Sequence, residues 1–455
     1  MKALNYFCHH HSTSSPSADS GHGYSCSISG QLWPRAQRPA GWFCPPNVRI
    51  KPGQELFFGH VFAEQFLFIP FTGYYGKGAR QILGIEQFKL GHSNGGSQDF
   101  SRIIRMLYHE DHFAKIAPHS FKAWEEVEKG SGLQLVHKTG MLAWTTQETG
   151  EVPLIDAYAD ATANTGAKCL KLTGAEINKR WPTFHVPDDA VGVLDYEGGL
   201  VDAAMGNAAH VQLAEGQGAH VMENTKVLKL VKLATGDVEV QTSRGVFICG
   251  KVIITCGAWL NQILSTVGVY IPVKVTQEQV TYIATPHLKE FTKEKYPVTI
   301  FPKPNAHIYT LPVHGMAAYK IGVDAGGNEV TADTRTFTPD AVREQMVMDY
   351  VRSYVPKAEG RIVETKTCLY TMTYDRNFLI DTLASKGQPN VVVCCGAGHA
   401  YKFASLFGRI LSELAIYNRT NYDIKAFRLN RPAITDPNFE PAFVHSYSSI
   451  GKAHL

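Results

Sequence analysis

One segment, residues 390–414, constrains the fold of this chain more than any other. Asn390 to Cys395 reads NVVVCC, an apolar run typical of a parallel strand buried on both faces. The turn Gly396-Ala397-Gly398 follows, and then a helical pattern whose apolar face holds Phe403, Phe407, Ile410, Leu411 and Leu414. A strand, a glycine turn and a helix in this order aim backbone N–H groups at an anion. The segment therefore predicts an α/β chain of the nucleotide-binding kind.

Two further segments extend this sheet, and one helix covers it. QILGIEQ at 81–87 and KVIIT at 251–255 read as buried strands, and the second ends in the turn Cys256-Gly257-Ala258-Trp259. Residues 112–129 predict a helix with Pro118 at its start or at a kink. Its inward residues are Phe113, Ile116, Trp124 and Val127.

The sequence between these units has a different hydrophobic pattern. Residues 279–284, 306–311 and 317–323 are short apolar or alternating stretches separated by turns, which predicts an antiparallel sheet with one covered face. Thr338-Pro339-Asp340 then opens a helix with a cap, a proline and an acid in the first turn. The sequence thus predicts a nucleotide-type α/β domain interleaved with an antiparallel substrate domain.

Composition excludes several classes of protein. The 455 residues predict two to three structural units, and the net charge of +3 is too small for a nucleic-acid surface. The nine cysteines contain no Cys-x-x-Cys pair, so neither a disulfide scaffold nor a metal site is expected. The best membrane candidate, 56–75, contains His60, Glu64, Gln65 and Pro70, and a buried helix or strand is the better interpretation.

The two ends of the chain differ in kind. Residues 1–55 are rich in Ser, Gly, Pro and His and keep no apolar period, which predicts a disordered leader. The last residues, Ala453-His454-Leu455, form a small-basic-Leu ending like the Ser-Lys-Leu peroxisomal address. Because a receptor must read such a tail, residues 446–455 are expected to be exposed.

Several short segments between residue 80 and the C-terminus form an ordered set. The segments are Glu86-Gln-Phe88, Ser101-Arg-Ile-Ile-Arg105, Lys138-Thr-Gly140, Glu176-Ile-Asn-Lys-Arg-Trp-Pro182, Gly257-Ala-Trp259, Cys368-Leu-Tyr-Thr371, Asp375, Phe378 to Asp381, Gly398-His-Ala-Tyr-Lys402 and Gly451-Lys-Ala-His-Leu455. In their residues and their order they resemble the monomeric sarcosine oxidase and pipecolate oxidase family of flavoproteins, within the D-amino-acid-oxidase-like superfamily. The shared order makes the set far more specific than any one segment.

The resemblance implies a Rossmann-like FAD-binding domain interleaved with an antiparallel-sheet substrate domain. The FAD-binding domain is expected over 56–136, 196–275 and 365–445, and the substrate domain over 137–195 and 276–364. FAD is the implied cofactor, covalently attached through Cys368. Glu86 would accept hydrogen bonds from the hydroxyl groups of the adenosine ribose. The remaining expected cofactor contacts are Gly257, Ala258, Gly396 and Gly398.

The N-terminal part departs from the family pattern. The family binds FAD with G-x-G-x-x-G between its first strand and first helix. This chain instead reads FFGHVFAEQFLFIPFTGYYGKGARQ, with Gly73, Gly76 and Gly78 in the wrong order and no recognisable strand before them. The first βα unit is therefore expected to be aberrant, either through an altered exon or gene model or because flavin binding is weakened or lost.

The resemblance also implies the residues around the substrate. Arg105 and Lys402 would bind its carboxylate, because a guanidinium fork and an ammonium suit that group. Arg102 and Tyr108 would border the flavin, and the i, i+3, i+6 spacing of the three residues predicts a helix that places them together. Lys320 would face the flavin and promote its reaction with oxygen by stabilising developing negative charge.

Two active-site positions do not match the family. Sarcosine oxidases carry histidine where this chain has Asp324 and again where it has Gln98. Asp324 could pair with a protonated substrate amine, so a substrate other than sarcosine is expected.

The predicted function is FAD-dependent oxidation of a secondary or N-substituted amino acid, which yields an imine and hydrogen peroxide. The expected partners are the amino acid, molecular oxygen and the peroxisomal import receptor, with no nucleic acid and no membrane. A peroxisomal location suits a peroxide-forming enzyme. Two alternatives remain open: a flavin dehydrogenase or glycated-amino-acid oxidase on the same fold, and a flavin-free relic or binding protein.

Overall fold

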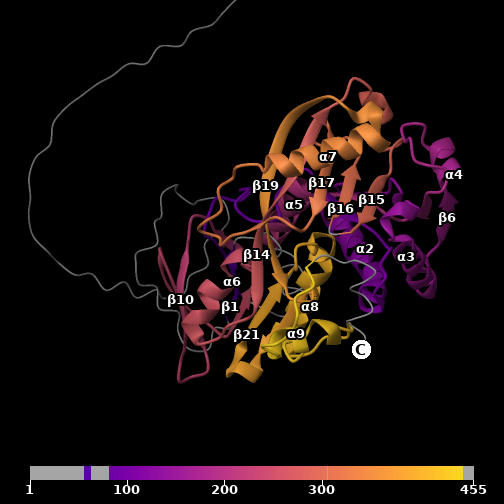
Figure 1. Cartoon of the computed structure of the whole chain (residues 1–455). Coiled ribbons are helices and arrows are strands. Elements are labelled where there is room, and N and C mark those ends of the chain that lie inside the picture. Colours follow the sequence, from indigo (N-terminus) through magenta and orange to yellow (C-terminus); the bar gives the residue numbers. More distant parts are fainter. Residues whose placement is uncertain (1–55, 63–80, 305, 444–455) are drawn as a thin grey trace, which may run out of the picture. The chain divides into compact units, whose positions relative to one another are not determined.

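The computed structural model describes residues 56–62, 81–304 and 306–443, all within one compact unit (Figure 1). A six-stranded sheet runs in the order β20-β21-β13-β1-β2-β9, and all its neighbouring pairs are parallel except β20–β21. Its strands are β1 (Leu56–Phe62), β2 (Gln81–Glu86), β9 (His220–Met222), β13 (Lys251–Ile254), β20 (Leu379–Leu383) and β21 (Gln388–Cys395). The three strands expected from residues 81–87, 251–255 and 390–395 are thus confirmed.

Strand β1 corrects one prediction. The backbone of LFFGHVF at 56–62 lies between β2 and β13, with Phe57 opposite both Ile82 and Lys251. A strand therefore does precede the glycines, and the strand interpretation of residues 56–75 holds for its first part. The rest of that segment, the leader 1–55 and the tail 446–455 lie outside the described residues.

Three helices pack with the parallel sheet in a shared apolar core: α2 (Asp111–Ser131), α5 (Ala203–Gly216) and α8 (Ala404–Tyr417). The four inward residues predicted for α2 are all buried. Pro118 lies inside this helix rather than at its start. In α8, Phe407, Ile410 and Leu411 are buried as predicted, while Phe403 lies just before the helix.

The second large sheet has nine strands. Eight of them run in the order β18-β14-β17-β16-β15-β5-β7-β6, and the ninth, β19, pairs with β14. Its pairs are antiparallel except β15–β5. The strands are β5 (Met141–Thr145), β6 (Cys169–Thr173), β7 (Val191–Asp195), β14 (Val273–Ala284), β15 (Val298–Lys303), β16 (Ala306–Leu311), β17 (Tyr319–Asp324), β18 (Asn328–Glu329) and β19 (Arg361–Thr373). The antiparallel sheet expected from residues 279–323 is confirmed.

Helix α7 (Ala341–Tyr354) lies across the strands of this sheet (Figure 1). Its side chains Val347, Met348 and Val351 are part of the apolar core there. Its N-cap is Asp340, whose carboxylate accepts from the backbone N–H groups of Val342 and Arg343. The predicted cap, Thr338, is therefore two residues too early. A carboxylate can accept two N–H bonds there and also complements the helix dipole.

The remaining elements are short. Two three-stranded sheets contain β3 (Ser101–Ile104), β8 (Gly199–Asp202) and β4 (Val136–His137), and β10 (Val227–Lys232), β11 (Val238–Thr242) and β12 (Gly245–Cys249). The other helices are α3 (Val152–Asn164), α4 (Gly174–Arg180), α6 (Leu260–Leu264) and α9 (Pro432–Thr435). Within the described ranges, no helix combines the length and apolarity needed to cross a bilayer, and no group of three His, Cys, Asp or Glu side chains could hold a metal.

The fold class is as predicted, a parallel α/β sheet interleaved along the chain with a largely antiparallel one. The proposed domain limits remain a prediction. Two of them fall inside long strands, since β14 crosses position 275 and β19 crosses position 364.

Candidate active site

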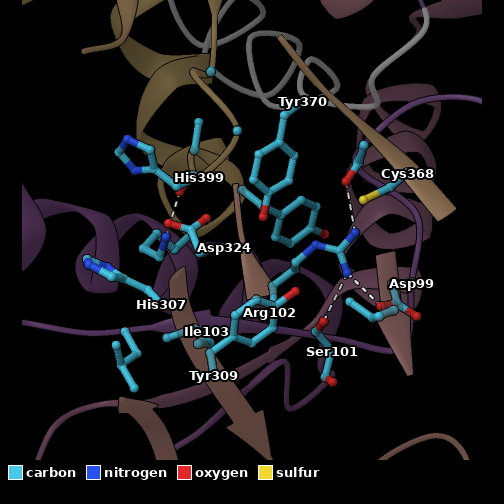
Figure 2. A pocket seen from close by; sticks show the side chains of 18 of the residues that line it. Asp99, Ser101, Arg102, Ile103, His307, Tyr309, Asp324, Cys368, Tyr370 and His399 are labelled. Atoms are coloured by element: carbon cyan, nitrogen blue, oxygen red, sulfur yellow. Dashed lines mark hydrogen bonds and ion pairs between the residues drawn. The ribbon is translucent and has the colours of Figure 1, made fainter. Parts of the chain in front are cut away.

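One pocket gathers most of the predicted site residues (Figure 2). Its walls come from β3 and the residues before it, from β16, β17 and β19, and from the turn between β21 and α8. The lining includes nine of the twelve predicted residues: Arg102, Arg105, Tyr108, Lys320, Asp324, Cys368, Gly396, Gly398 and Lys402. Segments far apart in the sequence therefore converge on one cavity.

The helix expected around Arg102 is wrong. Ser101–Ile104 forms strand β3, which pairs with β8, so the i, i+3, i+6 spacing does not describe a helix face. All three residues nevertheless line the pocket, because the chain turns after β3. The Arg105 guanidinium lies 4.5 Å from the centre of the Tyr108 ring and 5.5 Å from that of Tyr158.

Arg105 and Lys402 have the properties of a carboxylate-binding pair. Nη1 of Arg105 is buried and has no hydrogen-bond partner among the described residues. The Lys402 ammonium donates to the His399 carbonyl at 2.6 Å. Burial, reinforced by the nearby Arg105 charge, lowers the pKa of Lys402 to about 7. A bound anion would restore the charged form of Lys402, because opposite charges favour ionisation.

Lys320 lies on the pocket side of β17, while Tyr319 and Ile321 point into the core under α7, because successive residues of a strand face opposite sides. Its ammonium contacts Oδ2 of Asp99 at 2.5 Å and the Ser101 carbonyl at 2.6 Å. Arg102 Nη1 reaches the same Oδ2 at 2.9 Å. Sequence analysis missed Asp99, which places a carboxylate between the two cations.

Asp324 is also paired. Its two oxygens accept from Nη1 and Nη2 of Arg376 at 3.2 and 3.4 Å, and Arg376 is almost fully buried. Burial alone would raise the pKa of Asp324, but the Arg376 charge holds it below its usual range. Arg376 therefore already neutralises the carboxylate that was expected to meet a substrate amine.

Gln98, the second position that differs from the family, also forms a hydrogen bond with another side chain. Its Oε1 accepts from Nδ2 of Asn207 at 3.1 Å. Figure 2 shows how the polar groups divide: Asp99, Arg102 and Cys368 lie on one side of the pocket, and Asp324, His307 and His399 on the other.

Three predicted cofactor residues lie away from the pocket lining, at the carboxyl edge of the parallel sheet. Glu86 ends β2, and Gly257 and Ala258 begin the short helix after β13. Glu86 is fully buried, and its Oε1 accepts from the Phe88 N–H at 2.8 Å. Its Oε2 has no hydrogen-bond partner among the described residues. A ribose diol donates hydrogen bonds, and a carboxylate oxygen at this edge of the sheet is the acceptor that it requires.

A family model described as FAD dependent oxidoreductase matches residues 72–414, well over half of the chain. The chain belongs to this family. The match begins after β1, and Glu86, Cys368 and Lys402 all fall within it. The buried Oε2 of Glu86, which accepts no hydrogen bond within the described ranges, and the glycine turn beside the pocket fit FAD. The segment between β1 and β2, where the family places its glycine fingerprint, lies outside the described residues.

Curated relatives agree with this assignment. The chain is 31% identical to a monomeric sarcosine oxidase of Arthrobacter sp. over 80% of its own length and 93% of the relative's. It is 30% identical to the peroxisomal sarcosine oxidase of Homo sapiens, over 85% of this chain and 95% of that one.

Solved structures show the same fold. NikD, described as an unusual amino acid oxidase essential for nikkomycin biosynthesis, superposes with a TM-score of 0.72 at 24% identity, over 82% of this chain and 97% of that one. Fructosamine oxidase from Aspergillus fumigatus has a TM-score of 0.69 at 16% identity, over 86% and 92% of the two chains. The FAD-binding fold predicted from sequence is confirmed.

Cys368 and the turn Gly396-Ala397-Gly398 also lie at this pocket. Burial raises the pKa of the Cys368 thiol to about 11, with the Arg102 charge acting in the opposite direction. Gly398 adopts φ +86°, and a Cβ there would lie 2.4 Å from the Tyr370 ring. Glycine is therefore required at this position both by backbone conformation and by space.

Proposed function

We propose that this chain oxidises the CH–NH bond of a secondary or N-substituted amino acid, with FAD as cofactor and oxygen as the final electron acceptor. The observation that carries the proposal is one pocket with two separate cationic groups: Arg105 and Lys402, suited to a carboxylate, and Lys320 with Arg102 beside Cys368. Membership of the FAD dependent oxidoreductase family supplies the cofactor.

The chain's own residues bind and orient the reactants. Arg105 and Lys402 hold the substrate carboxylate, which fixes the direction of the C–N bond and removes much of the entropy cost of alignment. Glu86 accepts the ribose hydroxyls, and Cys368 is the proposed point of covalent attachment. FAD held by these residues would supply the redox chemistry, which is the uptake of a hydride from the substrate carbon and the delivery of two electrons to oxygen, which with two protons gives hydrogen peroxide. The imine left behind is hydrolysed by water.

The pairing of Asp324 with Arg376 bears on substrate choice. Asp324 presents a neutralised pair to the substrate rather than a free carboxylate, and Gln98 is held by Asn207. The relatives named sarcosine oxidase support an N-substituted amino acid as the substrate class. We propose that the particular amino acid is set by the Asp324–Arg376 side of the pocket.

The function is tested by the absorption spectrum of the purified chain before and after acid precipitation. We expect a flavin spectrum with maxima in the visible range and yellow colour that remains with the precipitated protein, because a thioether through Cys368 survives unfolding. The Cys368→Ser variant should release any flavin into the supernatant.

Two other outcomes of that experiment discriminate the alternatives, and a second measurement, in which substrate is added without air and air is then admitted, separates an oxidase from a dehydrogenase. Colourless protein would favour the flavin-free relic, the alternative raised by the position of Gly73, Gly76 and Gly78 in the sequence. Colour that leaves wild-type protein with the acid supernatant would refute covalent attachment alone. A flavin that substrate reduces but air does not reoxidise would identify a dehydrogenase.

We further propose that the tail Ala453-His454-Leu455 directs the chain to peroxisomes, as the human and mouse relatives named peroxisomal sarcosine oxidase suggest. A fluorescent protein fused to the N-terminus should give punctate fluorescence that coincides with catalase. Extending the chain beyond Leu455 should move the fluorescence to the cytosol, because the import receptor reads a free C-terminus. Unchanged puncta would remove the tail from the proposal.

A further inference from the structure

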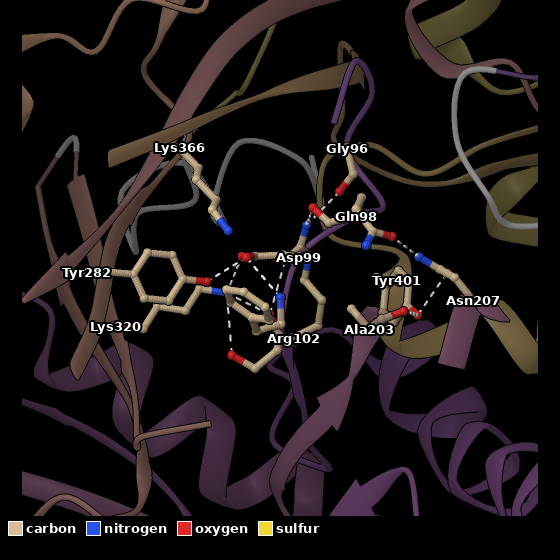
Figure 3. A network of polar contacts seen from close by, with 12 residues as sticks. Gly96, Gln98, Asp99, Arg102, Ala203, Asn207, Tyr282, Lys320, Lys366 and Tyr401 are labelled. Atoms are coloured by element: carbon tan, nitrogen blue, oxygen red, sulfur yellow. Dashed lines mark hydrogen bonds and ion pairs between the residues drawn. The ribbon is translucent and has the colours of Figure 1, made fainter. Parts of the chain in front are cut away.

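Asp99 is the centre of a buried polar network on the Lys320 side of the pocket (Figure 3). Its Oδ2 accepts from Lys320 Nζ at 2.5 Å and from Arg102 Nη1 at 2.9 Å. Its Oδ1 accepts from the Tyr282 hydroxyl at 2.5 Å and from the Phe100 N–H at 2.9 Å. This one carboxylate therefore accepts four hydrogen bonds, and two of them come from cations.

Burial makes this arrangement energetically important. The side chains of Asp99 and Lys320 are each 3% exposed. Removing one partner of such a pair leaves an uncompensated buried charge, which is far more costly than losing an exposed ion pair. Burial alone would raise the pKa of Asp99, yet the charges of Lys320 and Arg102 hold it below its usual range.

The two cations depend on Asp99 to different degrees. Arg102 also donates to three backbone carbonyls, those of Gly96 at 2.8 Å, Ser101 at 3.0 Å and Gln98 at 3.4 Å. Within the described ranges, Lys320 otherwise donates only to Ser101, through its carbonyl and, at 3.5 Å, its hydroxyl. Asp99 is thus the one carboxylate that Lys320 contacts among the described residues.

We propose that Asp99 is a positioning residue of the pocket, which keeps the Lys320 ammonium charged and fixed where the proposed oxidase needs it. Two cations and one carboxylate leave the cluster with one net positive charge. This charge remains available to the pocket, and it is lost when Lys320 is neutral, because Arg102 and Asp99 then cancel one another. The inference rests on the proposed function for its purpose, but the charge state of Lys320 can be measured without turnover.

The other groups around Lys320 lower its pKa or change it little. Burial, followed by the neighbouring Arg102, lowers the pKa of Lys320 to about 8 even with Asp99 present. The Tyr282 ring lies 5.8 Å from Nζ, and Lys366 Nζ lies 5.3 Å from the same ring. The Cys368 thiol is neutral at physiological pH because burial raises its pKa to about 11.

The test is the pH dependence of the free energy of unfolding in urea from pH 5 to 10, measured on the full chain as purified. Lys320 has a lower pKa folded than unfolded, so the unfolded state binds more protons between those values and stability rises with pH there. Subtracting the profile of Lys320→Met from that of the wild type isolates this contribution. The same subtraction between Asp99→Asn and Asp99→Asn/Lys320→Met gives it without the carboxylate.

We expect the lower midpoint of the Lys320 contribution to move down by about one pH unit or more in the Asp99→Asn background, a tenfold or greater loss of proton affinity. Asp381→Asn is the matched control, because Asp381 is also buried and paired with an arginine, Arg428 at 2.5 Å, but lies outside the pocket lining. It should leave the midpoint unchanged.

Each remaining outcome decides the question. An unchanged midpoint in Asp99→Asn overturns the proposal. If Asp99→Asn does not fold but the double variant does, the uncompensated Lys320 charge is the cause and the proposal stands. If neither folds, Asp99 supports the backbone through Phe100 rather than Lys320, and the proposal fails. None of these results depends on oxidase activity, so failure of the proposed function would be recognised separately.

Discussion

In a flavin-loaded preparation, Lys320→Met should slow the reaction of reduced enzyme with oxygen by roughly 100- to 1000-fold. Methionine keeps about the same length and the apolar stem but deletes the charge. Because Arg102 and Asp99 then cancel, the net charge of the cluster falls from one to zero. A preorganised buried charge aimed at developing negative charge contributes about 2.7–4 kcal/mol in comparable sites. Stopped-flow mixing with oxygen would measure this half-reaction.

Anaerobic reduction by substrate should fall much less, because hydride transfer does not create that negative charge. Lys366→Met is a useful control, since Lys366 lines the same pocket but lies over the Phe100 ring at 4.1 Å and pairs with the exposed Glu364. It should change oxygen reactivity by less than about tenfold, as expected for a screened charge. Equal losses in both half-reactions of Lys320→Met would mean that Lys320 supports the sheet or the flavin position instead.

The sequence predicted the sheets well because their strands are marked locally. Residues 81–87, 251–255 and 390–395 are apolar runs that end in a glycine turn or an acid, the pattern of strands buried on both faces. Strand β1 was not recognised as the first strand because Gly59 and His60 interrupt its apolar run. Its place between β2 and β13 also depends on long-range pairing. The helix cap at Asp340 was missed by two residues, the usual uncertainty of element ends.

The site was predictable only where a resemblance supplied the roles. Arg105, Lys320 and Lys402 do share a pocket, but the spacing argument for Arg102 failed because a strand followed by a turn brings these side chains together as well as a helix would. Asp99, Tyr282 and Arg376 gave almost no sequence signal. Tyr282 reaches Asp99 because β14 pairs with β17 and places it opposite Lys320. Such partners are fixed by tertiary pairing, which periodicity does not encode.

Arg105→Met should lower kcat/KM for the amino acid substrate by roughly 100-fold or more, because truncating one partner of a buried, hydrogen-bonded charge pair costs about 2–5 kcal/mol. The carboxylate is bound equally before and during the chemical step, so most of the loss should be in KM rather than kcat. Arg105→Lys should be intermediate, since it keeps the charge but loses the planar fork. Steady-state kinetics over a range of substrate concentrations would separate the two constants.

The sharper test compares the amino acid with the same amine lacking its carboxylate. Wild-type enzyme should prefer the amino acid strongly, and Arg105→Met should reduce that preference by the same factor as it reduces kcat/KM. Arg352→Met, at an exposed position on α7, should leave the preference unchanged. If Arg105→Met slows both compounds equally, Arg105 acts through Tyr108 and Tyr158, the rings that it covers, and the carboxylate must be held by Lys402 without it.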